Sequence, residues 1–191
     1  MATHESAAVR RAQILDAALQ CFGEKGFSRA KMDDIVQASG LSKGAIYWHF
    51  KSKDEIFLAL FDTYAESIFE AWQQVETNST LEQLYLQGDI VLRQILETRE
   101  LLDTWVEFFG HPAVRERFAE VYQQSRTELA KLIQVGIAQG EIQTCEPTHI
   151  ASALTALIEG LLLQVLVDAE YDVLAAWPEA WRIFSAGLTA K

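Results

Sequence analysis

The spacing of apolar residues constrains this 191-residue chain more than any other feature, because such residues recur three and four apart nearly throughout. That spacing places apolar side chains on one face of an α-helix, and no segment shows the sustained alternation with β-branched residues that is typical of a strand. Half of the residues are hydrophobic, which suffices for a core without disulfides or metal ions. The sequence therefore predicts an all-α protein with about nine helices.

Caps and helix-breaking residues predict where these helices begin and end. Pro112 and Pro147 suit first helical positions. Ser52 and Thr80, each followed three residues later by Glu or Gln, are typical of capping boxes. The expected helices are 8–24, 32–40, 41–50, 53–77, 80–97, 100–109, 112–140, one opened by Pro147, and a last one that Pro178 either begins or kinks.

Charge divides the chain unevenly. Residues 1–53 carry eight Lys and Arg against five Asp and Glu, a net charge of +3, whereas residues 54–191 carry eight against twenty-two, a net charge of −14. Nucleic acids are bound through local phosphate contacts, so a basic head can bind DNA although the whole chain has a net charge of −11. A solvated surface with no binding role is the alternative that charge alone leaves open.

The stretch LSKGAIYWHF, residues 41–50, carries the most informative chemistry. With MDDIVQASG before it, this stretch predicts the second helix of a helix-turn-helix, whose N-terminal residues enter the DNA major groove. Ser42 is a natural N-cap, and Lys43 can meet a guanine edge or a phosphate. The small residues Gly44 and Ala45 let the backbone approach DNA closely.

The remaining residues of the stretch divide between DNA contacts and core. Tyr47 and His49 can donate hydrogen bonds to phosphate oxygens, and Lys51 and Lys53 add positive charge just beyond. Trp48 has two open roles, contact with a thymine methyl group or a sugar, and packing on the head. The residues expected to form the core of the head are Ile35, Leu41, Ile46 and Phe50.

At these residues the chain resembles the TetR family of bacterial transcription regulators. The matching runs are AQILDAALQCFGEKGF, MDDIVQASGLSKGAIYWHF and KSKDEIFLAL, within about the first 60 residues, while GHPAVRERF, the GEI turn and LTALIEGLLLQVL look similar to the branch of the betaine-synthesis repressor. The resemblance implies a helix-turn-helix DNA-binding domain at 1–53 and a ligand-binding and dimerisation domain at 54–191. It further implies a homodimeric repressor that binds a palindromic operator and is released by a small molecule.

The resemblance also implies which side chains touch DNA. The family commonly has threonine or serine where Ala30 and Lys31 stand; here Lys31 can supply a charge to a phosphate, but it cannot cap the following helix. The predicted DNA-binding residues are Lys31, Ser42, Lys43, Gly44, Ala45, Tyr47, Trp48, His49 and Lys53.

Two sets of body residues have both a functional and a packing interpretation. Aromatic residues can line a ligand cavity or fill the core, and beside Glu107 or Glu159 they can hold a cationic ligand, although a solvated face also explains the acids. The apolar C-terminal helices can pair with a second copy or be buried in one chain. The ligand-binding candidates are Trp72, Tyr85, Trp105, Phe109 and Tyr122, and the dimerisation candidates are Leu154, Leu157, Leu161, Val165, Trp181 and Phe184.

Other functions are disfavoured by the residue pattern. The four histidines are scattered without convincing carboxylate or thiol partners, so no enzyme activity, cofactor or metal site is expected. Cys145 and His149 stand at a spacing open to a metal pair, but Pro147 favours ordinary helix-end residues. No signal peptide opens the chain, and Glu159 and Gln164 interrupt its most apolar stretch, so a cytoplasmic protein without a membrane span is expected. A helical adaptor that never touches DNA is the rival interpretation.

Overall fold

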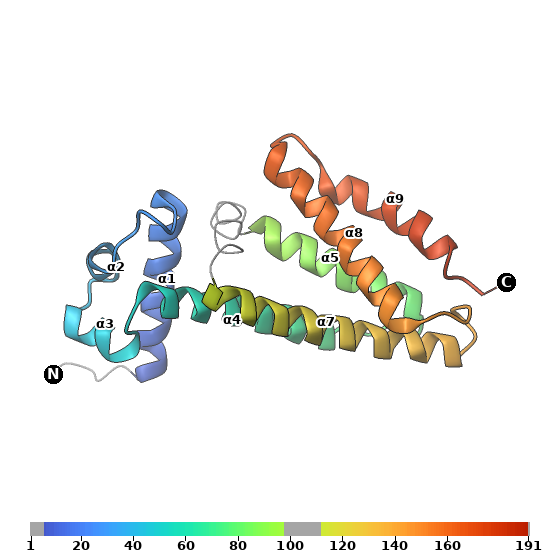
Figure 1. The fold of residues 1–191 in the computed structure, drawn as a ribbon, viewed down its shortest axis with the longest axis horizontal. Helices are drawn as coiled ribbons and strands as arrows, with labels where there is room; N and C mark the ends of the chain where they lie inside the picture. Colours follow the sequence, from blue (N-terminus) through green and yellow to red (C-terminus); the bar gives the residue numbers. More distant parts are fainter. Residues whose placement is uncertain (1–5, 98–111, 191) are drawn as a thin grey trace. The chain divides into compact units, whose positions relative to one another are not determined.

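The computed structural model describes residues 6–97 and 112–190, and within these ranges the chain forms eight α-helices and no strand beyond one isolated bridge (Figure 1). The predicted all-α fold is therefore confirmed, while the predicted helix at 100–109 lies outside the described residues. The helices are α1 (Ala7–Lys25), α2 (Met32–Ser39), α3 (Lys43–His49), α4 (Lys53–Gln73), α5 (Thr80–Glu97), α7 (Pro112–Ala138), α8 (Pro147–Val167) and α9 (Val173–Ala186).

The described residues fall into two compact units. The first contains residues 6–66 and 112–117, and the second contains residues 67–97 and 118–190. Because α4 runs from Lys53 to Gln73, this one helix contributes residues to both units. The predicted functional division at residue 53 stays a prediction.

In the first unit, a small core holds α1, α2 and α3 together. Ile14, Ile35 and Ile46, one from each helix, are fully buried. Phe22 and Phe27 add an aromatic contact with ring centroids 5.3 Å apart. Together with Leu41 and Phe50, which are also buried, these residues confirm the apolar core predicted for the head.

The turn between α2 and α3 is fixed by glycine and by hydrogen bonds. Gly40 has a φ of +66°, a left-handed conformation that favours glycine. Beside it, the backbone N–H of Leu41 donates to Ser39 Oγ at 3.3 Å. Gln13 Nε2 of α1 donates to the Ser39 carbonyl at 2.9 Å. These contacts fix the backbone where the chain enters α3.

In the second unit, α5 packs against α8 and α9, and α8 packs against α9 (Figure 1). Trp177 of α9 is fully buried and stacks on Tyr85 of α5, with ring centroids 5.6 Å apart and an interplanar angle of 7°. Its indole lies against Gly88, where an added Cβ would come within 2.7 Å of Trp177 Cη2. The close approach of α9 to α5 therefore depends on the missing side chain of Gly88.

Helix boundaries confirm some predicted caps, correct one, and decide a helix start that the sequence left open. Ser52 Oγ accepts from the Glu55 N–H at 3.2 Å, one half of the predicted capping box, while the Glu55 carboxylate accepts from the Lys51 N–H at 2.6 Å. At α5, however, the cap is Ser79, whose Oγ accepts from the Glu82 N–H at 3.2 Å, and Thr80 is already helical. The last helix begins at Val173, with Asp172 as its N-cap, so Pro178 lies inside the helix and does not begin it.

The turn after α7 holds the start of α5. Gly140 has a φ of +76°, so the predicted stop is confirmed. Next to it, Glu141 accepts hydrogen bonds from the backbone N–H groups of Thr80 at 2.6 Å and Leu81 at 3.1 Å. The isolated antiparallel bridge joins Ile142 to Thr189 and so ties this turn to the end of the chain.

Among the described helices, α8 is the one that is long and apolar enough to cross a membrane by length and composition alone. In this structure it packs against α5 and α9. Five of its residues are buried: Ala151, Leu154, Ile158, Leu161 and Val165.

Candidate DNA-binding interface

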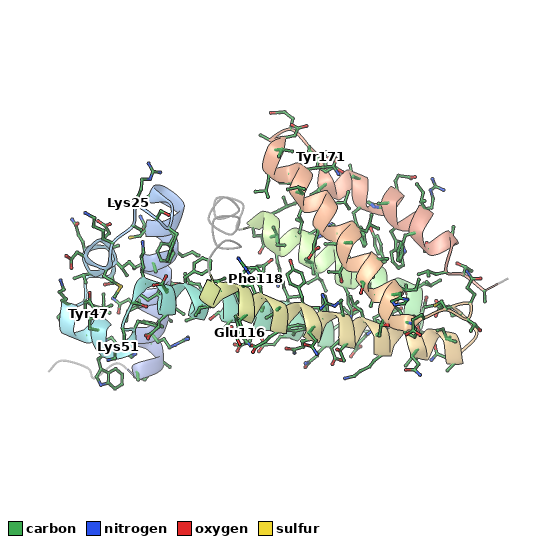
Figure 2. The ribbon with its side chains drawn as sticks, in the orientation of Figure 1. Lys25, Tyr47, Lys51, Glu116, Phe118 and Tyr171 are labelled. Carbon is green, nitrogen blue, oxygen red and sulfur yellow. The ribbon has the colours of Figure 1, made fainter. Side chains whose placement is uncertain are left out.

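The helix α3 is anchored by one face and exposed on the other. Ile46 and Phe50 are buried, and Ser42 Oγ accepts from the Ala45 N–H at 3.2 Å, which begins the helix as predicted. The exposed residues are Ser42, Lys43, Gly44 and Trp48, while Ala45, Tyr47 and His49 are partly exposed. Figure 2 labels Tyr47 on this helix and Lys51 just beyond it.

The first turn of α3 is open to close approach. A Cβ added at Gly44 would meet no heavy atom within 4 Å, apart from neighbouring residues and the backbone of its own helix. Ser42 and Lys43 are exposed beside it. A ligand surface can therefore come near the backbone of this turn, as a base edge in the major groove does.

Trp48 is exposed over 69% of its surface. Its ring makes a T-shaped contact with His49, with centroids 4.5 Å apart. The alternative in which Trp48 packs into the head is therefore not what the structure shows. Contact with a thymine methyl group or a sugar stays a prediction for this side chain.

Lys43 forms an ion pair with an acid of the preceding helix. Its Nζ lies 2.7 Å from Asp33 Oδ1 of α2, and it also lies 5.9 Å from the centroid of the Tyr47 ring. The hydrogen bond to Asp33 raises the pKa of Lys43 above its ordinary value. Both partners are largely exposed, at 61% for the Lys43 side chain and 73% for Asp33, so the pair itself adds little stability.

Two further lysines are hydrogen-bonded to backbone carbonyls of the head. Lys51 Nζ donates to the Tyr47 carbonyl at 2.7 Å. Lys53 Nζ donates to the carbonyls of Phe27 at 2.8 Å and Ala30 at 3.0 Å, and it lies 4.2 Å from the centroid of the Phe27 ring. Lys53 thus joins the start of α4 to the loop between α1 and α2, and its predicted DNA contact stays a prediction.

Lys31 is exposed at the start of α2 and caps it only with its backbone. Its N–H donates to Asp34 Oδ2 at 2.8 Å, while Lys25 Nζ donates to Asp34 Oδ1 at 2.8 Å. The hydrogen bond from Lys25, followed by that from the Lys31 backbone, lowers the pKa of Asp34. Asp34, at the third helical position, therefore supplies the reciprocal half of a capping box by accepting from the N-cap N–H, while the half that threonine or serine at position 31 would supply is not made by the Lys31 side chain.

Three of the predicted ligand-binding residues of the body, Trp72, Tyr85 and Tyr122, lie in the described part of the chain, and each has its own contacts. Trp72 is buried and donates from Nε1 to the Gln87 carbonyl at 3.1 Å, and Tyr85 belongs to the aromatic stack with Trp177. Tyr122 is partly exposed and has a pKa raised by burial and by its hydrogen bond with Glu159. The other two candidates, Trp105 and Phe109, lie outside the described residues.

The predicted dimerisation residues are divided between the interior and the surface. Leu154, Leu161 and Val165 are buried within one chain, so their side chains are used in the packing of α8. Leu157, Trp181 and Phe184 are partly exposed. Trp181 lies 6.2 Å from Tyr85 and 5.9 Å from Phe184 between ring centroids, so one ligand candidate and two dimerisation candidates share an aromatic cluster.

A different face of α8 is apolar and exposed. Leu163 is 59% exposed and Val167 is 79% exposed. With three small exposed residues they recur three and four apart, which places them on one face of the helix. We call this set the α8 stripe: Ala153, Ala156, Gly160, Leu163 and Val167.

Three polar residues with clear structural contacts were not predicted from the sequence. Asp33 pairs with Lys43, Glu141 accepts from the start of α5, and Gln87 is buried. Within the described ranges, Gln87 Oε1 has no hydrogen-bond partner. Only the acidic character of Asp33, ten residues before Lys43, offered a signal, because the other two contacts join distant parts of the chain.

In the described part of the chain, no group of three or more His, Cys, Asp and Glu is placed to hold a metal ion. His149 is exposed and Cys145 is partly exposed just before α8.

Comparisons with known families agree with this geometry. Residues 14–60 match the family model described as bacterial regulatory proteins of the tetR family. Residues 81–177 match the model described as the C-terminal part of BetI-type transcriptional repressors. The first match contains α2 and α3, and the second begins in α5 and ends in α9.

Individual relatives extend the similarity over nearly the whole chain. The HTH-type transcriptional regulator TtgR of Pseudomonas putida is 28% identical over 94% of this chain and 90% of its own. An HTH-type transcriptional repressor of Mycobacterium tuberculosis is 51% identical over 53 residues, 28% of each chain. A TetR transcription regulator of Haloarcula marismortui has a similar fold, with a TM-score of 0.86, 19% identity, and coverage of 95% of this chain and 99% of that one.

Proposed function

Because the chain belongs to the TetR family of bacterial transcriptional regulators, we propose that it is a repressor that binds a palindromic operator as a homodimer and is released by a small molecule. One observation carries this proposal: the first turn of α3 is exposed and unobstructed at Gly44, while Ile46 and Phe50 anchor the same helix in the core. This is the arrangement that a recognition helix needs to enter a major groove.

The proposed DNA contacts divide between bases and phosphates. Ser42, Lys43, Gly44 and Ala45 lie near base edges, and Trp48 contacts a thymine methyl group or a sugar. Phosphate oxygens are contacted by Tyr47, His49, Lys31 and Lys53. For Lys53 to do so, its ammonium must keep or exchange its hydrogen bonds with the carbonyls of Phe27 and Ala30.

A second copy of the chain is proposed to cover the α8 stripe. The small residues of the stripe let two helices approach closely, and Leu163 and Val167 provide apolar area that water otherwise covers. Ile183 of α9 is a further exposed apolar residue. A two-fold dimer matches the two half-sites of a palindrome.

The small molecule is proposed to bind within the second unit. A buried amide oxygen without a partner costs roughly 1–3 kcal/mol, so a ligand that donates a hydrogen bond to Gln87 Oε1 would offset that cost. Tyr122 and Glu159, joined by their hydrogen bond, offer a second polar group. No enzymatic activity is proposed, and the site of action is the cytoplasm, where operator DNA lies.

Release of DNA is proposed to pass through α4, because this helix contributes residues to both compact units. A ligand that binds one pose of the body more tightly than another shifts the population of poses. If α4 moves with the body, the distance between the two recognition helices changes. Successive major grooves repeat at roughly 34–36 Å, so a dimer that misses this spacing loses one half-site.

The first test is selection of random duplex DNA on the purified protein, followed by binding of the winning sequence across a salt series. A palindrome whose affinity falls steeply with salt supports the proposal. The double variant Lys43→Ala with Tyr47→Ala is expected to remove this binding. Selection without any sequence preference would contradict operator binding and would favour the adaptor interpretation.

A further inference from the structure

The ion pair between Lys43 and Asp33 lies at the N-terminus of the recognition helix. Lys43 is the first residue of α3, and Asp33 is the second residue of α2. The 2.7 Å contact between Nζ and Oδ1 therefore joins the two helices of the helix-turn-helix at their exposed ends. This contact favours one position for the charge of Lys43 before DNA is present.

The neighbouring acid, Asp34, has a different role. Both of its carboxylate oxygens accept hydrogen bonds, one from the Lys31 N–H and one from Lys25 Nζ. Asp34 thus belongs to the cap of α2 and to the packing of α1. Asp33 is far more exposed, and its Oδ1 accepts from Lys43.

The helix dipole makes a counterion useful at this position. The N-terminus of a helix carries a partial positive charge, which disfavours a lysine in the first turn. The Asp33 carboxylate compensates for this effect and holds the ammonium beside the first turn of α3. Without Asp33, the flexible lysine chain would let the charge reach many positions.

We propose that Asp33 is a positioning residue for sequence recognition, because it holds the Lys43 ammonium toward a guanine edge and away from phosphates. This inference rests on the proposed operator binding. An ammonium has three N–H donors, so the bond to Asp33 leaves two for the O6 and N7 acceptors of guanine. When the base is not guanine, Lys43 must break its ion pair with Asp33 to reach a phosphate. The unpaired Asp33 carboxylate then faces the DNA, which disfavours binding to the wrong sequence.

Asp33→Asn tests this inference, because it removes the charge and keeps the shape of the side chain. Affinity is measured for the selected palindrome and for a scrambled duplex of equal length, across a salt series. The variant is expected to bind the scrambled duplex more tightly and to lower the ratio of the two affinities about tenfold. The magnitude of its salt slope on the scrambled duplex is expected to rise by about 1, because one more lysine is free for phosphate.

Two variants control for charge and for shape. Glu24→Gln also removes one acid from the head, at a residue that accepts from Gln20 Nε2, and it is expected to leave the affinity ratio unchanged. Asp33→Glu keeps a carboxylate within reach of Lys43 and is expected to restore part of the ratio. Circular dichroism melting confirms that each variant is folded.

A double mutant separates positioning from simple repulsion. If Asp33 acts through Lys43, Asp33→Asn has less than about a twofold effect on the affinity ratio once Lys43 is alanine. If instead Asp33→Asn raises affinity for both duplexes equally, with or without Lys43, the inference is overturned. A wild-type protein that selects no sequence would defeat the proposed function itself, and this inference with it.

Discussion

At the scale of single residues, exposure separates the roles of the aromatic side chains in and next to α3. Phe50 is buried, whereas Trp48 stands largely in solvent. Truncation of an exposed side chain rarely changes stability by more than roughly 0.5 kcal/mol. We therefore expect Trp48→Ala to leave thermal unfolding nearly unchanged and to weaken operator binding about tenfold, measured by fluorescence anisotropy.

Phe50→Ala is the contrasting variant. It should cost about 3–5 kcal/mol of folding free energy, because a large buried side chain is lost from the core of the head. A Trp48→Ala variant that melts as early as Phe50→Ala would contradict the assignment of Trp48 to DNA. It would return this side chain to the packing role.

Two helical glycines make a second residue-scale prediction, since their surroundings differ. An added Cβ at Gly88 meets the ring of Trp177 at 2.7 Å from Cη2, whereas at Gly44 it meets no atom within 4 Å. Gly88→Ala is expected to destabilise the fold by about 1–3 kcal/mol through overpacking. Gly44→Ala should be neutral or stabilising by up to about 1 kcal/mol. Chemical denaturation measures both, and equal effects would show that the ring of Trp177 yields to the new methyl group.

The residues of the head show what a sequence predicts at this scale. Apolar periodicity identified Ile35, Ile46 and Phe50 as core, because burial is a property that spacing along a helix reveals. It could not identify the partners of Lys43 or Lys53, which come from other elements. The positions of these partners depend on how the helices pack, and the identity of one charged residue does not reveal that packing.

At the scale of elements, the start of α5 at Thr80 depends on a carboxylate 61 residues away in the sequence. Glu141 accepts from the N–H groups of Thr80 and Leu81 and from the hydroxyl of Ser79. Burial alone would raise the pKa of Glu141, but these hydrogen bonds outweigh it, and the pKa is lowered from its ordinary 4.5. We expect Glu141→Gln to cost about 1 kcal/mol at neutral pH, the usual cost of a lost helix cap.

The same contact predicts a pH dependence. Because the folded pKa of Glu141 lies below the unfolded value, its contribution to stability is present above pH 4.5 and is lost as pH falls through the folded pKa. Urea unfolding as a function of pH should show that the free energy of unfolding falls less in acid for Glu141→Gln than for the wild type. Glu128→Gln, at an exposed acid of α7 paired with Lys131, should follow the wild type. If Glu141→Gln lost stability in acid as steeply as the wild type, the cap would not be the source.

Helix boundaries were predictable where a local residue decides them. Pro147 and Gly140 act within their own turn, so both boundaries were predicted correctly. The start of α5 agrees with the predicted 80–97, but its cap is Ser79 and not Thr80, because both residues fit a capping box and the distant Glu141 favours Ser79. The sequence left the start of α9 open, because Pro178 can begin a helix or be tolerated inside one; in the structure it lies inside, on an exposed turn.

At the scale of the whole molecule, α8 has one apolar face that is buried within the chain and another that is exposed. Leu154, Leu161 and Val165 are buried within the chain, while the α8 stripe is exposed. The sequence predicted that α8 is covered on more than one side, and of its four dimerisation candidates on this helix Leu154, Leu161 and Val165 are buried while Leu157 is partly exposed. When a helix is apolar on all of its faces, its sequence does not indicate which face packs against the rest of the chain. That choice is made by the packing against α5 and α9.

The last prediction concerns this face. Leu163→Glu combined with Val167→Glu places charges where two copies are proposed to meet, so we expect the dimer to dissociate in sedimentation equilibrium. Because these side chains are exposed, the variant should keep its helical circular dichroism. Val135→Glu, at another exposed apolar residue, on α7, should remain a dimer.

Loss of the dimer should weaken binding to the full palindrome but not to a single half-site. A linked pair of heads binds two half-sites with an avidity that exceeds single-site affinity by about 100-fold or more. The double variant should lose that factor on the full palindrome, yet it should bind a duplex with one half-site as the wild type does, because α3 is untouched. Equal losses on both duplexes would mean that the substitutions damage the head. A variant that stays dimeric would place the interface on another surface, and the partly exposed Trp181 and Phe184 would be the next residues to change.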